Sequence, residues 1–196
     1  GATAPALNEN SGAGQVVYTA KASDTLTKTV SYSLKSGEDA SAFSIDGKTG
    51  EVKLTGNPDY ETKSLYAFTV VATDDAGNQA EKAVSLGIND VNEFSVTAPS
   101  DSNVGADQVA ENAAIGTTVG ITAAASDADA TTNTVSYSLV GNADGSGTSS
   151  GEFAIDASTG VVTVAGGIDR EEGSSRTIYV KATSIDGSSA IRWISA

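Results

Sequence analysis

The chain of 196 residues is long enough for two domains of ordinary size, and 39% of its residues are hydrophobic but only 6% aromatic. Its 25 acidic and 11 basic residues give a formal net charge of −14, which opposes binding to nucleic acid and to anionic membranes. The sequence contains no Cys and no His, so thiol nucleophiles, imidazole bases, Cys/His zinc sites and disulfides are excluded.

In chain order, the predicted elements are short strands whose apolar residues alternate with polar ones, and no substantial helix is expected. In the first half, the inward residues are Val30, Tyr32 and Leu34, then Val52 and Leu54, then Phe68, Val70 and Ala72, and finally Val84, Leu86 and Ile88. In the second half, they are Val135, Tyr137 and Leu139, then Val162 and Val164, and then Ile178, Val180 and Ala182. The spacing predicts about seven strands in each half, as in a β-sandwich.

The second half repeats the first. Val30–Leu34 returns unchanged as Val135–Leu139, and the segment Phe43–Val52 returns in similar form as Phe153–Val162. The period of about one hundred residues corresponds to one sandwich in each unit. We therefore predict an all-β chain of two tandem seven-stranded Greek-key β-sandwiches arranged end to end. The predicted domains are residues 1–89 and 94–196, joined by a linker of residues 90–93.

The repeated segment contains a predicted tight turn. Asp46 and Asp156 are expected to accept hydrogen bonds from their own turns, because Asp readily bonds nearby backbone amides. Each turn ends in Thr-Gly, and Gly50 and Gly160 are free to adopt a positive φ. Trp193 is expected to pack against the final strand; the alternative is an exposed Trp that stacks on a sugar.

Many carboxylates lie at the ends of the predicted strands and in their connections. These acidic residues are Glu9, Asp59, Glu61, Asp90, Glu93, Asp127 and Asp129. In a stacked pair of sandwiches, the last loops of the first unit, the linker and the first loops of the second unit would meet at one junction. Carboxylates gathered there would repel one another without a counter-ion. Calcium fits, because it takes 6–8 oxygen ligands in loose geometry.

These motifs resemble the extracellular cadherin repeat, and the resemblance covers nearly the whole chain twice. Asn8–Asn10 and Ala110–Asn112 are similar to the Pro-Glu-Asn motif of that family, and Ile168–Glu171 is similar to its Leu-Asp-Arg-Glu motif. Asp90–Glu93 resembles the family's linker, and Asp127–Asp129 its Asp-x-Asp motif.

The resemblance implies an inter-repeat calcium site that holds two to three ions. The implied side-chain ligands are Glu9, Asp59 and Glu61 of the first unit, Asp90, Asn92 and Glu93 of the linker, and Asp127 and Asp129 of the second unit. Backbone carbonyls near Val91 and Phe94 complete the implied set.

The sequence departs from the family pattern at several positions. Ser184 stands where the family has an Asp ligand, and Asp186 is a candidate replacement. Asp24–Leu26 replaces the Asp-x-Asp motif in the first unit, so that half-site is expected to be degraded. Glu111, Asp169 and Glu171 form a second half-site, expected to be open.

The leading interpretation is a calcium-dependent structural and adhesive module from a larger extracellular or cell-surface protein. Its expected partners are calcium, neighbouring repeats, and a homophilic protein partner or a surface glycan. The Ser/Thr/Ala-rich composition of the repeats resembles that of large bacterial adhesins. The alternative interpretation is a carbohydrate-binding cadherin-like module. No enzyme is expected, because the chain lacks catalytic groups. Asp169 and Glu171 could suggest the paired carboxylates of glycoside hydrolysis, but their spacing recurs at Asp59 and Glu61, and one chain would not need two such active sites.

Overall fold

The computed structural model describes residues 1–23 and 29–195. The chain forms two compact units, Gly1–Val91 and Asn92–Ala196. The boundary between them falls inside the segment 90–93 that the sequence suggested as a linker. The predicted degraded motif Asp24–Leu26 lies outside the described residues.

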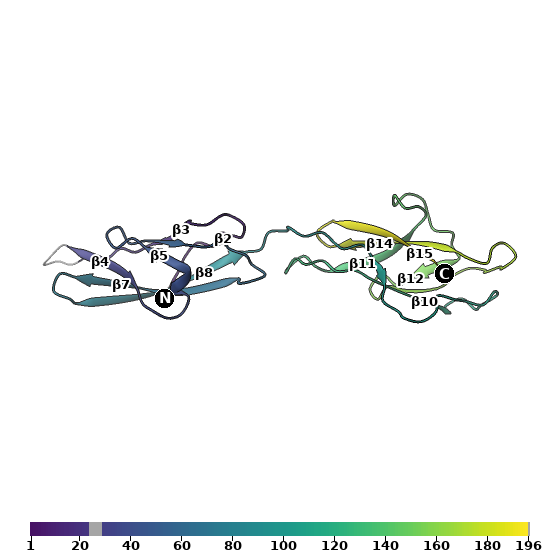
Figure 1. Ribbon diagram of the computed structural model, residues 1–196, viewed down its shortest axis with the longest axis horizontal. Helices are drawn as coiled ribbons and strands as arrows, with labels where there is room; N and C mark the ends of the chain where they lie inside the picture. The colour runs from purple at the N-terminus through teal and green to yellow at the C-terminus, as the bar shows by residue number, and fades with distance from the viewer. Residues whose placement is uncertain (24–28, 196) are drawn as a thin grey trace. The chain divides into compact units, whose positions relative to one another are not determined.

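Unit 1 is a sandwich of two sheets. Its strands are β1 (Ala2–Thr3), β2 (Leu7–Asn8), β3 (Val16–Thr19), β4 (Val30–Leu34), β5 (Phe43–Ile45), β6 (Glu51–Leu54), β7 (Leu65–Asp74) and β8 (Gln79–Asn89). One sheet has the order β1-β8-β7-β4, with β2 also paired to β8, and the other has the order β3-β6-β5. Figure 1 shows β3 and β5 in one layer, with β7 and β8 in the other. The edge strand is divided into β1 and β2 around Pro5, whose nitrogen has no hydrogen to donate to a ladder.

Unit 2 repeats this arrangement. Its strands are β9 (Ser100–Asp101), β10 (Thr118–Ala124), β11 (Val135–Val140), β12 (Phe153–Ile155), β13 (Val161–Val164), β14 (Thr177–Ser184) and β15 (Ser189–Ser195). The sheets have the orders β12-β13-β10-β9 and β11-β14-β15. Within the described residues, the helical structure is one 3-10 turn, Ala40–Ala42. The prediction of two tandem all-β sandwiches is confirmed.

Each unit has its own hydrophobic core, built by the alternation along the strands. Phe68 and Leu86 are fully buried in unit 1, and Val162 and Val180 are fully buried in unit 2. Phe68 packs on Phe43 with ring centroids 4.4 Å apart. Period-two alternation therefore does predict which face of each strand is buried.

Tyr32 and Tyr137, which the sequence pattern placed among the inward residues, extend from the cores to the loops. Tyr32 and Tyr137 pack against the buried clusters of their units, as expected. The hydroxyl of Tyr32 accepts the Ala22 N–H at 3.0 Å, and that of Tyr137 accepts the Ala125 N–H at 2.9 Å. A packed ring with a satisfied hydroxyl is the usual arrangement for Tyr.

The predicted Asp turns are present in both units. The Asp46 carboxylate accepts the backbone N–H groups of Lys48 and Thr49, both at 2.8 Å. These backbone donors hold the pKa of Asp46 below its ordinary value. Gly160, which ends the copy of this turn, has φ of 71° and lies so close to Ala123 that an added Cβ would be 2.2 Å from its carbonyl oxygen. Only glycine fits there without strain.

Candidate metal centre

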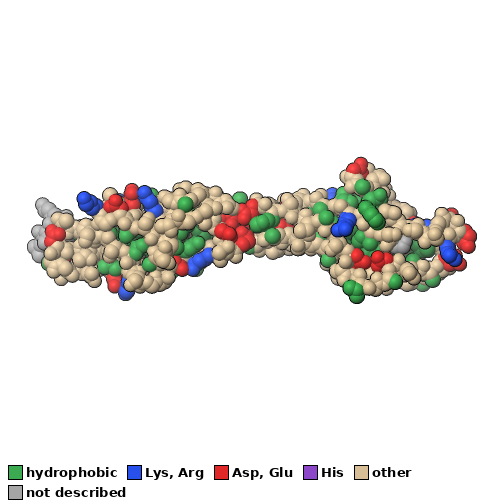
Figure 2. All heavy atoms as spheres, in the orientation of Figure 1, with side chains coloured by type: hydrophobic (Ala, Val, Ile, Leu, Met, Phe, Trp, Pro, Cys, Tyr) green, Lys and Arg blue, Asp and Glu red, His purple; other side chains and the backbone are tan. Residues whose placement is uncertain are grey.

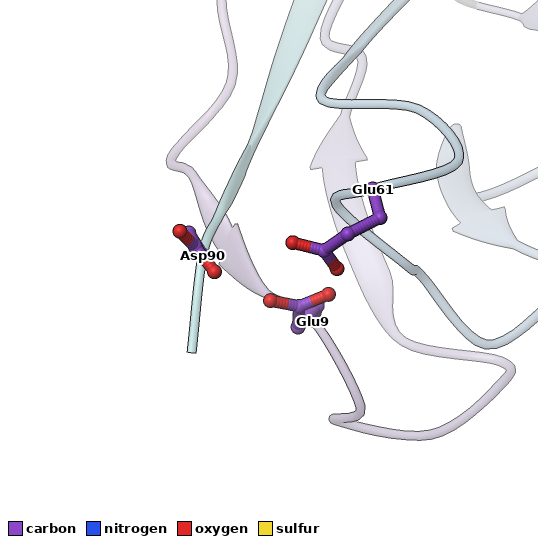
Figure 3. A group of neighbouring side chains, drawn as sticks. All are labelled: Glu9, Glu61 and Asp90. Carbon is purple, nitrogen blue, oxygen red and sulfur yellow. The ribbon is translucent and has the colours of Figure 1, made fainter. Parts of the chain in front are cut away.

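Three carboxylates of unit 1 point toward one another. One oxygen from each of Glu9, Glu61 and Asp90 can be chosen so that all three atoms lie within 4.8 Å of one another. Figure 3 shows the carboxyl groups of Glu61 and Asp90 on either side of Glu9. Acidic side chains gather at the end of unit 1 where β8 ends, as Figure 2 shows. We call Glu9, Glu61 and Asp90 the unit 1 acidic group.

Glu9 is the buried member of this group and is only 3% exposed. One carboxylate oxygen accepts the Tyr60 N–H at 2.7 Å, and the other accepts the Val91 N–H at 2.7 Å. The backbone N–H of Glu9 donates to the Asn89 carbonyl at 3.1 Å, which ties the residue to the end of β8. Glu9 is thus fixed in place by charge-assisted hydrogen bonds on both oxygens.

Asp59 is not part of the unit 1 acidic group, although the sequence predicted it as a ligand. Its carboxylate accepts the backbone N–H of Thr62 at 2.9 Å and the hydroxyl of Thr62 at 2.9 Å. These bonds hold the pKa of Asp59 below its ordinary value. Asp59 therefore stabilises its own turn, and its role as a ligand stays a prediction.

Unit 2 contains a second group, Asp127, Asp129 and Asp186, whose chosen oxygens also lie within 4.8 Å of one another. We call it the unit 2 acidic group. Asp129 is completely buried, and Asp127 is 9% exposed. Each of these two carboxylates has a buried oxygen (Oδ2) without a hydrogen-bond partner. Buried polar atoms in folded proteins are nearly always satisfied, so two adjacent carboxylate oxygens without a partner make this group suited to bind a cation.

The other oxygen of Asp129 binds the segment that the sequence suggested as part of the linker. It accepts the N–H groups of Glu93 at 3.0 Å and Phe94 at 3.3 Å. These contacts orient Asp129 with its partnerless Oδ2 in the group. The carbonyl oxygens near Val91 and Phe94 stay predicted ligands, and the side chain of Glu93 belongs to none of the three-residue groups of the described chain.

Asp186, and not Ser184, is the third member of the unit 2 acidic group. Ser184 is buried and donates its hydroxyl to the Thr132 carbonyl at 2.8 Å. Asp186 accepts the side-chain N–H of Asn92 at 2.8 Å and the backbone N–H of Ser188 at 2.7 Å. The first of these bonds contributes most to holding the pKa of Asp186 below its ordinary value. The signal in the sequence was an Asp two residues after the substituted position.

Glu111, Asp169 and Glu171 form a third group of carboxylates in unit 2, and all three are exposed. The carboxylate of Asp169 accepts the Glu171 backbone N–H at 2.8 Å. Glu111 and Glu171 are the repeat equivalents of Glu9 and Glu61 in unit 1. The three carboxylates are thus close together, and their role as a calcium half-site stays a prediction.

The three groups have the donor chemistry of a site for a hard cation. Two carboxylates at 4.8 Å repel by roughly 3 kcal/mol at the effective dielectric constant of a protein surface. The available ligands are oxygens alone, since the chain has no Cys and no His. Such a set suits calcium, which accepts many oxygens in irregular geometry, better than zinc or copper. The residues present therefore fit calcium.

Comparison with known proteins identifies the repeats. The family described as Cadherin domain matches residues 5–89 and 107–191. The chain is 37% identical over 185 residues to mouse protocadherin Fat 4 and 34% identical over 179 residues to human cadherin-23. The matches cover 90% of this chain but only 4% and 5% of those proteins, so the chain spans a small part of its relatives' length.

Solved structures give the same result for the fold. A three-repeat fragment of mouse cadherin-23, EC22-24, is 25% identical with a TM-score of 0.76; the match covers 99% of this chain and 61% of that one. Protocadherin gammaB7 EC3-6, solved as a cis-dimer, is 22% identical with a TM-score of 0.80, and the match covers 99% of this chain and 44% of that one.

The fold and the repeat place the chain among the extracellular β-sandwich modules of adhesion proteins. The chain belongs to the cadherin family and contains two cadherin domains. These domains are extracellular adhesion modules and are not enzymes. Within the described residues, no helix is long and apolar enough to cross a membrane. The relatives named above are animal proteins, so they give no support to the prediction of a bacterial adhesin.

Proposed function

We propose that this chain is a calcium-dependent adhesion module in which ions stiffen the connection between the two repeats. The observation that carries the proposal is the pair of buried, partnerless oxygens on Asp127 and Asp129, next to the third carboxylate of Asp186. A bound cation would satisfy both atoms and remove the repulsion between the three carboxylates.

The order of residues in the chain supports sharing of ions between the repeats. Asp90 belongs to the unit 1 acidic group, and Asn92, only two residues later, donates to Asp186 of the unit 2 acidic group. Two to three calcium ions would neutralise most of the charge of these two groups. Glu61 is exposed and would supply an outer ligand, whereas Glu9 and Asp129 would supply inner ones.

Calcium titration by calorimetry tests the binding. The expected result is binding in the range of about 10⁻⁴–10⁻³ M, as for other extracellular modules. Asp90→Ala is expected to remove part of the heat, and Asp46→Ala, in an exposed turn of the same unit, is the matched control and should leave it unchanged. Absence of calcium binding by the native chain would overturn the proposal.

Small-angle scattering tests the stiffening separately. We expect the scattering to fit a single conformation in calcium and a broader ensemble in a chelator. Identical profiles in both conditions, with calcium bound, would mean that the ions stabilise each repeat alone. The homophilic partner expected for an adhesion module is tested by sedimentation of the same samples.

A second candidate function is glycan binding, favoured by the position of Trp193. This residue is 61% exposed rather than packed as expected, because it alternates with the inward Ile194 on β15. Tyr179 lies opposite Trp193 on β14, and Val140 lies opposite Tyr179 on β11. This cross-strand row is an aromatic and apolar surface on which a sugar ring could stack. Binding to a glycan array that Trp193→Ala abolishes, without changing calcium affinity, would support this function.

A further inference from the structure

Two neighbouring carboxyl groups of unit 2 belong to none of the three acidic groups. Asp101 is in β9, at the start of a loop formed by residues 102–106, and Asp107 follows that loop. Both side chains are partly buried. The Oδ1 atom of Asp107 is buried and has no hydrogen-bond partner.

Asp101 is firmly attached to the neighbouring strand. Its Oδ1 atom accepts the backbone N–H of Thr122 in β10 at 2.9 Å and that of Asn103 at 2.9 Å. The backbone N–H of Ser102 donates to the Thr122 carbonyl at 2.9 Å. These bonds fix the first end of the loop to β10 and fix the orientation of the Asp101 carboxylate.

The second end of the loop returns to the same strand. The Ala106 carbonyl oxygen lies only 2.3 Å from the position that a Cβ on Gly120 would occupy. Gly120 has a positive φ of 88° and interrupts the regular pairing of β10 with β13 between Thr118 and Thr122. The missing side chain lets the chain approach β10 closely, which brings Asp107 beside Asp101.

Two ionised carboxylates in this arrangement repel each other, and the buried oxygen of Asp107 has no donor. Burial, followed by the charge of Asp101, raises the pKa of Asp107 above its ordinary value. One proton shared by the pair removes the repulsion and supplies the missing donor. Carboxyl pairs that share a proton in this way titrate as a unit.

We propose that Asp101 and Asp107 form a proton-operated clasp, in which a shared proton fastens the loop 102–106 to β10 and its loss loosens the loop. Because the folded pKa is raised, the stabilisation is fully present below the ordinary Asp pKa of 3.8 and is lost as the pH rises through the folded value. Acidification therefore tightens this part of unit 2.

The charged groups around the pair are those of the elements that line the adjacent hollows. Glu111, Arg170 and Arg176 line the same hollow as Asp107, and Arg192 of β15 lines a hollow with Asp101. Arg176 is paired with Glu152 at 2.9 Å, so its charge is already compensated. β10 itself contributes no titratable side chain.

Carboxyl NMR of the metal-free full chain tests the clasp directly. We expect the Asp107 carbon signal to titrate with a midpoint above 3.8. Asp101→Asn is expected to lower that midpoint, because it removes the neighbouring negative charge. A midpoint for Asp107 at or below 3.8 would overturn the proposal.

Thermal unfolding gives an independent test, and Trp193, the single tryptophan, reports on unit 2. At pH 7.5, Asp107→Asn is expected to raise the melting temperature by about 4 °C, because the repulsion is removed. At pH 4 the difference should shrink. The matched control is Asp144→Asn, in which the lost carboxylate accepts the Ser146 N–H in an exposed turn, and no rise is expected. A lower melting temperature for Asp107→Asn than for the native chain at pH 7.5 would overturn the clasp. Displacement of the Asp107 proton by millimolar calcium would also overturn it, because the pair would then be a cation site.

Discussion

Replacing Asp129 by Asn changes the charge of the unit 2 acidic group while it keeps the shape of the side chain. The amide oxygen of the substituted side chain can still accept the N–H groups of Glu93 and Phe94, which bond to Oδ1 in the native chain. The amide nitrogen takes the place of the partnerless Oδ2 and can donate to Asp127 or Asp186. In the absence of calcium, this substitution should therefore stabilise unit 2.

The size of the effect follows from the geometry. Asp129 takes part in two of the three repulsive pairs, each worth roughly 3 kcal/mol at 4.8 Å before the exposure of Asp186 is considered. A net gain of about 2 kcal/mol is expected, which corresponds to a rise of about 8 °C in the melting temperature of unit 2. In 5 mM calcium, the native chain should gain about 2 kcal/mol if its Kd is about 10⁻⁴ M, whereas the variant should gain little. The two melting temperatures should thus converge in calcium.

Trp193 fluorescence measures this transition in unit 2, with and without calcium. The same measurement on Asp144→Asn controls for the loss of one negative charge from the unit. Two results would refute the reasoning. One is a lower melting temperature for Asp129→Asn in chelator, and the other is an undiminished calcium response in that variant.

Gly160→Ala should destabilise unit 2 by about 2 kcal/mol or more, because φ is positive at this position and the new Cβ would lie 2.2 Å from the Ala123 carbonyl oxygen. Chemical denaturation followed by fluorescence measures this loss of stability. Phe68→Ala should cost unit 1 about 3–5 kcal/mol and leave the unit 2 transition unchanged, which calorimetry would resolve as a downward shift of one peak alone. Asp156 has a pKa below the ordinary value because the side chain of Ser158 and the backbone of Thr159 donate to it, so its contribution to stability is present above about pH 4 and is lost as the pH falls. Asp156→Ala should therefore melt lower than the native chain at pH 7 and approach it at pH 2.

The burial pattern could be predicted from the sequence because strand periodicity is local. The alternation of Phe68 and Val70 indicates the inward face of β7, and the same rule applied to Ile194 places Trp193 on the outside. The expectation that Trp193 packs against the final strand is wrong, and the alternative of an exposed Trp is the one that the structure shows. For Trp193, the alternation of inward and outward residues along the strand was the better basis for prediction.

The acidic groups were harder to predict, because they depend on the paths of loops. The motif with Asp59 predicted a ligand, yet the neighbouring Thr62 offers two donors that its carboxylate accepts. Asp186 joins the unit 2 acidic group through the geometry of the turn between β14 and β15, which periodicity does not describe. The approach of Asp101 to Asp107 likewise depends on the space at Gly120, and no local sequence pattern indicates this approach.

The two units share one identical strand sequence, and this matters for how the chain folds. β4 reads Val-Ser-Tyr-Ser-Leu, β11 begins with the same five residues, and each pairs in antiparallel fashion with a strand of its own unit, β7 or β14. During folding, either copy can pair with the partner strand of the other repeat, which is a kinetic trap typical of tandem domains with similar sequences. The ion pair Lys35–Glu81 lies across the unit 1 sheet just beyond β4, whereas in unit 2 Lys181 of β14 lies opposite Ser138. Because the shared five residues are identical, the residues that differ, in the partner strands and beyond the shared segment, must decide which copy finds its proper neighbour.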